Sequence, residues 1–220
     1  MTTAQFRRAR RPEQVEARRA AILDAAGAML AERPVAEISL RELADRVGLA
    51  KSNVLRYFDS REAIFLAVLE RAWTDWLDRL ELPVSRSRAR HAREVAVARA
   101  IAEALVASPL VCELLSVMGG VLERNISLEF AREFKRRATA STQRLAAMVR
   151  TRIPELSEDG ATHFAGVAVV LVAGLWPYAN PTPAVARAAE ELGAPCAADL
   201  FSQGLTDALV NQLVGLVARS

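Results

Sequence analysis

A short segment, residues 39–58, has side chains and spacing suited to binding a polyanion. Its first half predicts a short helix that Ser39 and Glu42 cap as a capping box. Gly48 stands where a helix end favours a left-handed residue, and a second helix is expected over residues 50–57. Two short helices joined in this way can place the second one in the major groove of DNA. The second helix would present these polar and cationic side chains: Lys51, Ser52, Asn53 and Arg56.

An ordinary helical hairpin with a solvated polar face is the alternative interpretation of this segment. The first helix, however, is too short to be stable on its own. The second helix carries no Asp or Glu among its outward-facing residues, which suits a negatively charged partner. The pattern therefore favours nucleic-acid binding.

Basic residues are concentrated towards the N-terminus. The formal net charge of the 220 residues is only +3, yet six acidic and two basic residues follow residue 157. Polyanion binding is therefore expected of the N-terminal part and not of the C-terminal part. An arginine run before the first expected helix is either a solvated tail or an arm that seeks phosphates. The members of this run are Arg7, Arg8, Arg10 and Arg11.

Several common kinds of catalytic and metal site are missing from the sequence. The two cysteines, Cys112 and Cys196, are far apart and predict buried thiols in a reducing cytoplasm instead of a disulfide or a zinc site. The two histidines, His91 and His163, belong to no H-E-x-x-H motif, and no nucleophile elbow or phosphate loop occurs. We therefore expect no enzyme activity, no cofactor and no metal.

The distribution of apolar residues indicates a folded cytoplasmic protein. Hydrophobic residues make up 52% of the chain, which allows a sizeable core and argues against disorder. No signal peptide is expected, because the N-terminus is polar and rich in arginine. The longest apolar run, residues 164–176, is too short to cross a bilayer and predicts a buried helix. We therefore expect no contact with a membrane.

Apolar residues recur at helical spacing along nearly the whole chain, and strand patterns are missing. The expected fold is all-α, with an N-terminal three-helix head and a C-terminal helical domain. The chain is expected to divide into the arm and head (residues 1–59), a connecting helix (60–80) and the C-terminal domain (81–220). Helices are expected over residues 13–32, 60–80, 109–118, 127–153, 157–178 and 199–218, with another ending near 107. A turn is expected at 176–181, and a short helix or an irregular segment over 182–192.

The first eighty residues combine motifs that occur together in one protein family. A long first helix is followed by Leu43-Ala44-x-x-x-Gly48-Leu49 and then by Tyr57-Phe58-x-Ser60-Arg61-Glu62-Ala63-Ile64. Over residues 18–80 the chain resembles the TetR family of bacterial transcription regulators. It departs from the family at two positions. Leu55 stands where the family often has tyrosine, and Asn53 stands where it usually has a small or polar residue.

This resemblance implies a homodimer with a DNA-binding head, a connecting helix four and a regulatory domain in each subunit. The last two long helices of each subunit would form a four-helix bundle, and a small molecule in the regulatory core would release the DNA. The N-terminus of the helix capped by Ser39 can hold a phosphate. By this resemblance, the recognition helix starts with Lys51, Ser52 and Asn53, which would meet base edges and nearby phosphates. The resemblance also assigns phosphate contacts to Tyr57 and Arg61. Arg56 is expected at phosphate as well.

The apolar run at residues 164–176 also favours a dimer, because a helix that is apolar on all sides must be covered all round. A monomer that buries this run internally is the alternative. An apolar lining of the regulatory core would suit a hydrophobic or aromatic effector. Candidates for this pocket are residues that combine bulk with a polar tip or that leave space beside them. Each one singly also fits core packing. The candidates are Trp73, Trp76, Cys112, Met118, Gly119, Phe130, Phe134, His163, Trp176, Tyr178 and Asn180.

Together these features predict a ligand-responsive repressor that binds double-stranded DNA at a palindromic operator. An activator is the first alternative, because the outcome depends on where the operator lies relative to the promoter. A helical small-molecule binding protein or enzyme with no DNA role is the second alternative. A specific shift of DNA by the folded, dimeric protein would separate this second alternative from the regulator.

Overall fold

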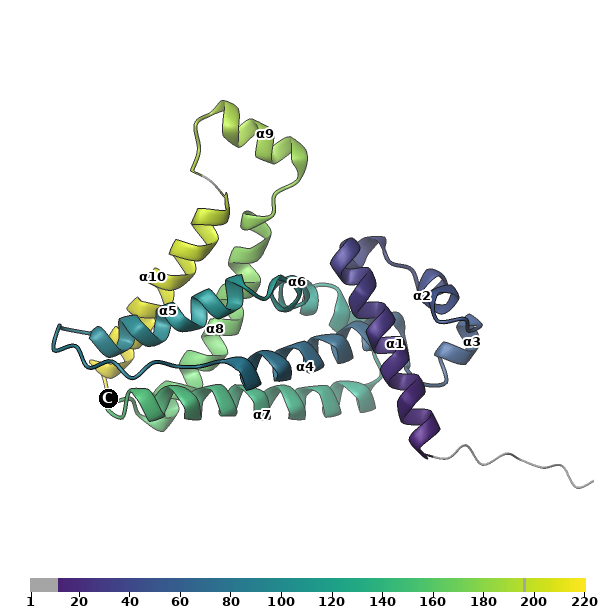
Figure 1. Cartoon of the computed structure of the whole chain (residues 1–220), viewed down its shortest axis with the longest axis horizontal. Coiled ribbons are helices and arrows are strands. Elements are labelled where there is room, and N and C mark those ends of the chain that lie inside the picture. Colours follow the sequence, from purple (N-terminus) through teal and green to yellow (C-terminus); the bar gives the residue numbers. More distant parts are fainter. Residues whose placement is uncertain (1–11, 196) are drawn as a thin grey trace, which may run out of the picture.

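The computed structural model describes residues 12–195 and 197–220. These residues form helices and turns without any strand, which confirms the predicted all-α class (Figure 1). The arginine run at residues 7–11 and Cys196 lie outside the described residues.

The N-terminal head consists of three helices around a small apolar core. Helix α1 supplies Ile22, Ala26 and Met29, and they meet Leu43 and Val54 in an almost fully buried cluster. Burial of such side chains stabilises a head whose second and third helices are too short to persist alone. The helices are α1 (Pro12–Glu32), α2 (Leu40–Arg46) and α3 (Lys51–Val54), with a 3₁₀ turn, η1 (Val35–Glu37), between the first two.

The C-terminal body packs long helices around a second part of the same apolar core. Helix α8 contacts α6, α7 and α10, and α10 also lies along α5. Helix α4 connects the two parts, because it packs on α1 in the head and on α6 and α7 in the body. The elements are α4 (Arg61–Arg79), α5 (Ala92–Val106), α6 (Pro109–Met118), η2 (Leu122–Arg124), α7 (Leu128–Arg152), α8 (Glu158–Ala179), α9 (Pro183–Glu191) and α10 (Ala197–Val217).

Serine caps determine where three of the long helices begin. Ser60 accepts a hydrogen bond from the Ala63 backbone N–H at 3.0 Å, and Ser127 does the same for Phe130 at 3.2 Å. Ser157 accepts from the Gly160 N–H at 3.1 Å. Each hydroxyl satisfies one of the backbone donors that a helix start leaves unpaired. The helix starts predicted near residues 60, 127 and 157 are therefore confirmed.

One predicted helix end was wrong. Helix α3 ends at Val54 and continues as a turn, although a helix was expected up to residue 57. Helix α8 ends at Ala179, within one residue of its predicted end at 178, and it runs through Pro177 although a turn was also expected over residues 176–181. Proline removes a single hydrogen bond here because it lies in the last turn, and the Asn180 side-chain amide donates to the Trp176 carbonyl at 3.1 Å. Tertiary packing of α8 thus overrides the local proline signal.

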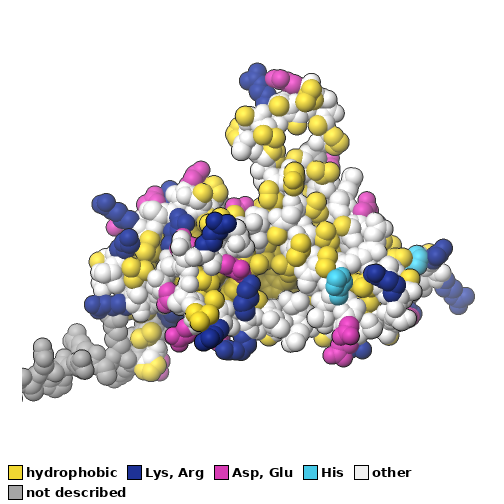
Figure 2. Space-filling model, turned by 180° about the vertical axis from the view of Figure 1, so that it is seen from behind, with side chains coloured by type: hydrophobic (Ala, Val, Ile, Leu, Met, Phe, Trp, Pro, Cys, Tyr) yellow, Lys and Arg dark blue, Asp and Glu magenta, His cyan; other side chains and the backbone are white. Residues whose placement is uncertain are grey.

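The apolar run of residues 164–176 belongs to a helix longer than the run itself. Within the described part of the chain, α8 is the only single helix whose length and composition would allow it to cross a membrane. Its most apolar stretch has a mean hydropathy of 1.5. It packs on three other helices, yet only 33% of that stretch is buried within one chain. Figure 2 shows hydrophobic side chains over the upright hairpin of α8 and α10. An apolar surface therefore remains uncovered on these two helices.

Candidate nucleic-acid interface and effector cavity

The second helix of the head begins with a complete capping box. The Ser39 hydroxyl accepts from the Glu42 N–H at 3.2 Å, and the Ser39 N–H donates to Glu42 Oε2 at 2.9 Å. Arg33 adds an ion pair to Glu42 at 2.9 Å. Hydrogen bonds from Ser39, with the Arg33 guanidinium beside them, lower the pKa of Glu42 from 4.5 to about 2. The predicted cap is confirmed, and the Glu42 carboxylate occupies the helix terminus where a phosphate was expected.

A left-handed glycine joins the two short helices. Gly48 has φ +65°, a conformation that costs a residue with a Cβ roughly 1–2 kcal/mol. Its N–H donates to the Asp45 carbonyl at 3.1 Å, and the Leu49 N–H donates to the Ala44 carbonyl at 2.9 Å. This pair of bonds is a Schellman motif, which ends α2 and fixes the direction in which the chain leaves it. The angle between α2 and α3 is thus set by hydrogen bonds within a few residues.

Helix α3 lies at the outer edge of the head (Figure 1). Val54 and Phe58 are buried in the head core. Lys51, Ser52 and Arg56 are exposed, and Asn53 is half-buried. Residues 46–58 contain no carboxylate, so nothing on this stretch opposes an approaching polyanion.

An arginine that the sequence did not indicate holds the end of this helix. Arg19 of α1 donates to the backbone carbonyl of Tyr57, and its guanidinium lies 4.3 Å from the centre of the Phe58 ring. The contact joins residues 38 positions apart, so no local pattern predicts it. Arg19 therefore fixes the Tyr57 backbone against α1.

Arg61 is held inside the head by its neighbours. Its guanidinium donates to the Ile38 carbonyl at 2.9 Å and pairs with Glu62 at 2.9 Å. The side chain is 24% exposed, so most of it faces protein. Arg61 therefore joins the start of α4 to the segment that enters α2.

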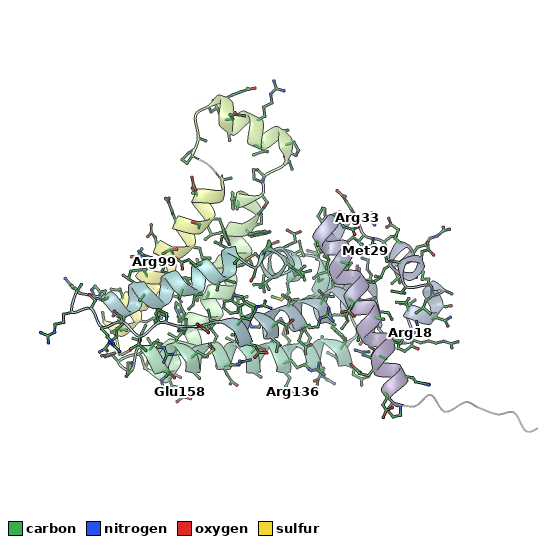
Figure 3. The ribbon with its side chains drawn as sticks, viewed as in Figure 1. Arg18, Met29, Arg33, Arg99, Arg136 and Glu158 are labelled. Atoms are coloured by element: carbon green, nitrogen blue, oxygen red, sulfur yellow. The ribbon has the colours of Figure 1, made fainter. Side chains whose placement is uncertain are left out.

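An open groove runs along α1 beside Tyr57. Its α1 wall includes Arg18, which is exposed and which Figure 3 labels on the lower half of α1. Arg18 thus adds a positive charge beside Tyr57, at a position that no sequence motif indicates. The groove is lined by Gln14, Ala17, Arg18, Ala21 and Tyr57.

The body contains a small apolar cavity between four helices. Its volume is about 80 Å³, and α4 supplies the Trp73 ring to its wall. The two polar groups of α7 in the wall are the hydroxyls of Ser141 and Thr142, and Thr142 donates to its own helix at the Ala138 carbonyl. The full lining is Leu69, Glu70 and Trp73 of α4, Leu115 and Met118 of α6, Phe134, Ala138, Ser141 and Thr142 of α7, and Val169 of α8.

Matches to models of known protein families cover nearly the whole described chain. Residues 22–68 match the family model "Bacterial regulatory proteins, tetR family", and residues 70–220 match "Tetracyclin repressor-like, C-terminal domain". The chain belongs to the TetR family. The sequence resemblance is thereby confirmed, and members of this family are transcriptional regulators and not enzymes.

Individual TetR relatives agree with this assignment. The transcriptional regulator RutR of Escherichia coli strain K12 is 35% identical over 68 residues, which are 31% of this chain and 32% of RutR. The match therefore spans about a third of this curated relative. A TetR-family regulator from Streptomyces coelicolor has 18% identity and a TM-score of 0.56 over 93% of this chain and 84% of its own. The repressor AlkX from a Dietzia strain has 18% identity and a TM-score of 0.53 over 90% and 96%. These two structures share the fold.

The cavity of this TetR member includes some of the predicted effector residues and not others. Trp73, Met118 and Phe134 line it, and the Phe130 ring stacks on Phe134 at 6.4 Å between centroids. His163 and Tyr178 are exposed residues of α8 that do not line the cavity. The remaining candidates away from the wall are Trp76, Cys112, Gly119, Trp176 and Asn180.

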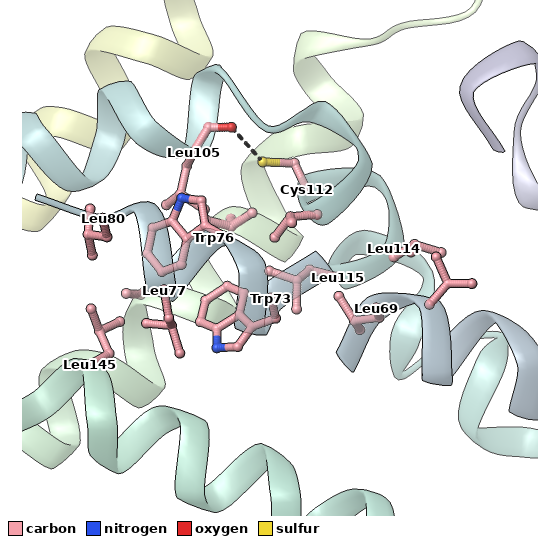
Figure 4. Close-up of a cluster of buried hydrophobic side chains, with 14 of the residues drawn as sticks. Leu69, Trp73, Trp76, Leu77, Leu80, Leu105, Cys112, Leu114, Leu115 and Leu145 are labelled. Carbon is pink, nitrogen blue, oxygen red and sulfur yellow. Dashed lines mark hydrogen bonds between the residues drawn. The ribbon is translucent and has the colours of Figure 1, made fainter. Parts of the chain in front are cut away.

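Three of these remaining candidates have structural contacts of their own. Cys112 donates to the Leu105 carbonyl at 3.3 Å, and burial raises its pKa to about 12 (Figure 4). Trp76 packs on Trp73 with 4.8 Å between ring centres. Trp176 donates its indole N–H to Glu113 at 2.9 Å. Bulk and a polar tip could therefore not distinguish cavity residues from packed ones in the sequence.

Proposed function

We propose that this protein is a ligand-responsive transcriptional repressor. It binds a palindromic operator as a homodimer and leaves the DNA when a small hydrophobic or aromatic effector occupies the body. The observation that carries this proposal is the exposed, acid-free surface of α3 on a head whose helix ends are fixed by hydrogen bonds. TetR-family regulators bind operators as dimers, and this chain offers the same architecture.

The roles of the head residues follow from their exposure. Lys51, Ser52 and Asn53 lie at the start of α3, where side chains of a recognition helix reach base edges. The amide of Asn53 would pair with adenine through two hydrogen bonds. Arg56 and Arg18 flank these residues and would neutralise phosphates. The Tyr57 side chain would meet the same backbone.

Ser39 and Arg61, which the sequence assigned to contact with DNA, have a supporting role in this proposal. The Ser39 hydroxyl both accepts from and donates to Glu42, so its hydrogen bonds are used within α2. Arg61 is engaged with Ile38 and Glu62. Both residues would orient the recognition helix from behind without touching phosphate.

The dimer would form through α8 and α10. These helices pack on each other, and α8 keeps most of its apolar stretch outside the core of one chain. A second copy that brings the same pair would bury this surface in a symmetric four-helix bundle. The two heads would then face two half-sites of one palindrome. A cytoplasmic location fits such a protein.

Helix α4 would transmit the effector signal. Its middle turns, with Leu69, Glu70 and Trp73, form one wall of the cavity, and the same helix packs against α1 of the head. Two further contacts tie α4 to α7, namely the hydrogen bond from Ser127 to Asp59, just before the two helices begin, and the ion pair of Arg137 with Glu70 in the middle of α4 at 2.7 Å. An effector that widens the cavity would move α4 relative to α7 and so change the distance between the two heads.

The DNA half of this proposal is tested with operator fragments selected from random DNA by the purified protein. Fluorescence anisotropy at several salt concentrations then compares Lys51→Ala, Asn53→Ala and Arg56→Ala with the parent. The matched control is Lys135→Ala, which removes the chain's other lysine, an exposed one on α7. We expect Arg56→Ala to weaken binding to all sequences and to lower the salt slope by about one unit.

The base-reading roles have their own readout in the same experiment. Lys51→Ala and Asn53→Ala should alter the preference between operator variants by about tenfold or more, while Lys135→Ala leaves it unchanged. No selected sequence from a folded, dimeric protein would overturn the DNA role. Unchanged discrimination in both variants would overturn the assignment of the base-reading residues.

A further inference from the structure

The two ends of the recognition helix α3 are held by different means. Its start follows the Gly48 turn, whose hydrogen bonds tie it to α2. The N-cap residue, Ala50, has no side-chain oxygen that could cap the helix, and α3 itself spans four residues. A helix this short does not persist alone. The position of its other end therefore depends on contacts from elsewhere in the fold.

Arg19 of α1 supplies such a contact. Its guanidinium donates a hydrogen bond to the backbone carbonyl of Tyr57, which lies in the turn that follows α3. Carbonyl groups at the end of a helix lack partners within the helix, and their partial negative charge favours a cation. Basic side chains that reach these carbonyls stabilise the helix end. Arg19 therefore caps the end of α3 from a different helix.

An aromatic ring fixes the place of the guanidinium. The Arg19 guanidinium lies 4.3 Å from the centre of the Phe58 ring, and Phe58 is only 4% exposed in the head core. A guanidinium is attracted to the face of such a ring, and its planar shape suits stacking. Because Phe58 belongs to the core, the capped carbonyl of Tyr57 has a defined position relative to α1.

The cap lies among the side chains that would contact phosphates. Arg56 directly precedes Tyr57, and Arg18 directly precedes Arg19 on α1. Arg18 and Tyr57 line the same groove, and Figure 3 labels Arg18 on the lower half of α1. The Arg19 contact therefore sets the spacing between the phosphate contacts of α1 and those at the end of α3.

We propose that Arg19 is a positioning residue of the DNA interface. It holds the end of α3 so that Arg56 and Tyr57 meet the same DNA backbone as Arg18, and it contacts no phosphate itself. The inference rests on the proposed DNA role of the head. The start of α3, where bases would be read, is fixed by the Gly48 turn. Arg19 therefore acts on affinity and leaves the sequence preference unchanged.

Hydrogen exchange of the free protein tests the cap without any DNA. Arg19→Met removes the guanidinium and keeps an apolar stem of similar course. The reporter is the amide of Tyr57, which donates to the Val54 carbonyl at 2.9 Å. We expect its exchange to become about tenfold faster or more, because a hydrogen bond from a charged group is lost. The amide of Leu49, at the start of the recognition segment, should exchange as in the parent.

Fluorescence anisotropy with the selected operator tests the role at DNA. We expect Arg19→Met to weaken binding about tenfold, with the preference among operator variants unchanged. In the Arg56→Ala background the same change should weaken binding by only about twofold, because the main contact that Arg19 positions is already gone. It should also leave the salt slope of that background unchanged, because no phosphate contact is removed.

Two further variants serve as controls. Arg18→Met is the matched control, because Arg18 is the exposed neighbour of Arg19 on the same helix. As a direct phosphate contact it should lower the salt slope by about one unit, and its loss of affinity should be the same with and without Arg56. Arg19→Lys keeps a charge and a donor without the planar fork, so it should lie between the parent and Arg19→Met in exchange and in affinity.

The outcomes separate the role of Arg19 from that of the head. A folded parent that binds no selected DNA overturns the DNA role, and the role of Arg19 with it. Equal operator affinity of the parent and Arg19→Met overturns the positioning role alone. A fall of the salt slope by about one unit when Arg19→Met is added to Arg56→Ala also overturns it, because the guanidinium then contacts a phosphate itself. Faster exchange at Tyr57, with a loss of affinity that depends on Arg56, supports the proposal.

Discussion

Replacement of Gly48 by alanine should destabilise the head by a predictable amount. Its φ of +65° costs an alanine roughly 1–2 kcal/mol. A Cβ built at this position meets no atom within 4 Å, so no steric clash adds to that cost. The smaller freedom of alanine in the unfolded chain offsets about 0.4–1 kcal/mol of it. The expected net loss is about 1 kcal/mol.

Gly119 provides the matched control for this substitution. A Cβ there also meets no atom within 4 Å, but its φ of −71° and ψ of −35° are ordinary right-handed values. Gly119→Ala should therefore stabilise the protein by about 0.4–1 kcal/mol, purely through the unfolded chain. Gly48→Asn should cost less than Gly48→Ala, because asparagine tolerates the left-handed region better.

Native-state hydrogen exchange is the suitable assay, because it reports local opening of the head without requiring the whole dimer to unfold. The amide of Leu49, which donates to the Ala44 carbonyl, is the reporter. A loss of about 1 kcal/mol corresponds to roughly fivefold faster exchange in Gly48→Ala. Unchanged exchange in that variant, or equal acceleration in Gly119→Ala, would refute the argument that the backbone conformation at residue 48 carries the turn.

Three further predictions concern single groups. The folded-state pKa of Glu42, about 2, lies below its ordinary value of 4.5, so its stabilising effect is complete above pH 4.5 and fades as the pH falls towards 2. A carboxyl titration by NMR should show this low pKa, and Ser39→Ala should raise it. Cys112, with its pKa near 12 and its thiol buried, should stay unmodified by iodoacetamide at pH 8 until the protein unfolds, as read by peptide mass mapping. Ala138→Phe adds more volume than the cavity of about 80 Å³ holds, so it should widen the cavity and weaken operator binding in anisotropy assays, and undiminished operator affinity of the folded variant would contradict the coupling through α4.

The features that the sequence predicted correctly depend on residues close together in the chain. The Ser39–Glu42 capping box and the Gly48 turn each involve positions at most five apart, so the chemistry of a few neighbours decides them. Pro177 shows the limit of such rules, because the packing of α8 extends the helix past a residue that locally favours a turn. The contact of Arg19 with the Tyr57 carbonyl depends on how α1 crosses the head, and no local pattern contains that information.

The lining of the cavity in the body could be predicted less well from the sequence, for the same reason. Its wall draws residues from four helices, and their facing sides are fixed only by the tertiary fold. Trp73 and Trp76 are three residues apart on α4 and look alike in the sequence. One lines the cavity, while the other lies buried with an indole nitrogen that finds no partner in the described part of the chain. Side-chain type alone therefore cannot assign a pocket residue in a helical body.

The small size of the cavity is itself an argument about how the switch works. Pockets for drug-sized ligands usually hold about 300–1,000 Å³, and this cavity holds about 80 Å³. A ligand that fitted without any change would bind the DNA-competent and the released forms equally, and it would shift nothing. A ligand that must widen the cavity binds the widened form better. A hundredfold loss of operator affinity requires that the ligand prefer the widened form by only about 2.7 kcal/mol. Because α4 is both a wall of this cavity and part of the head core, widening the cavity would displace α4 and so move the head.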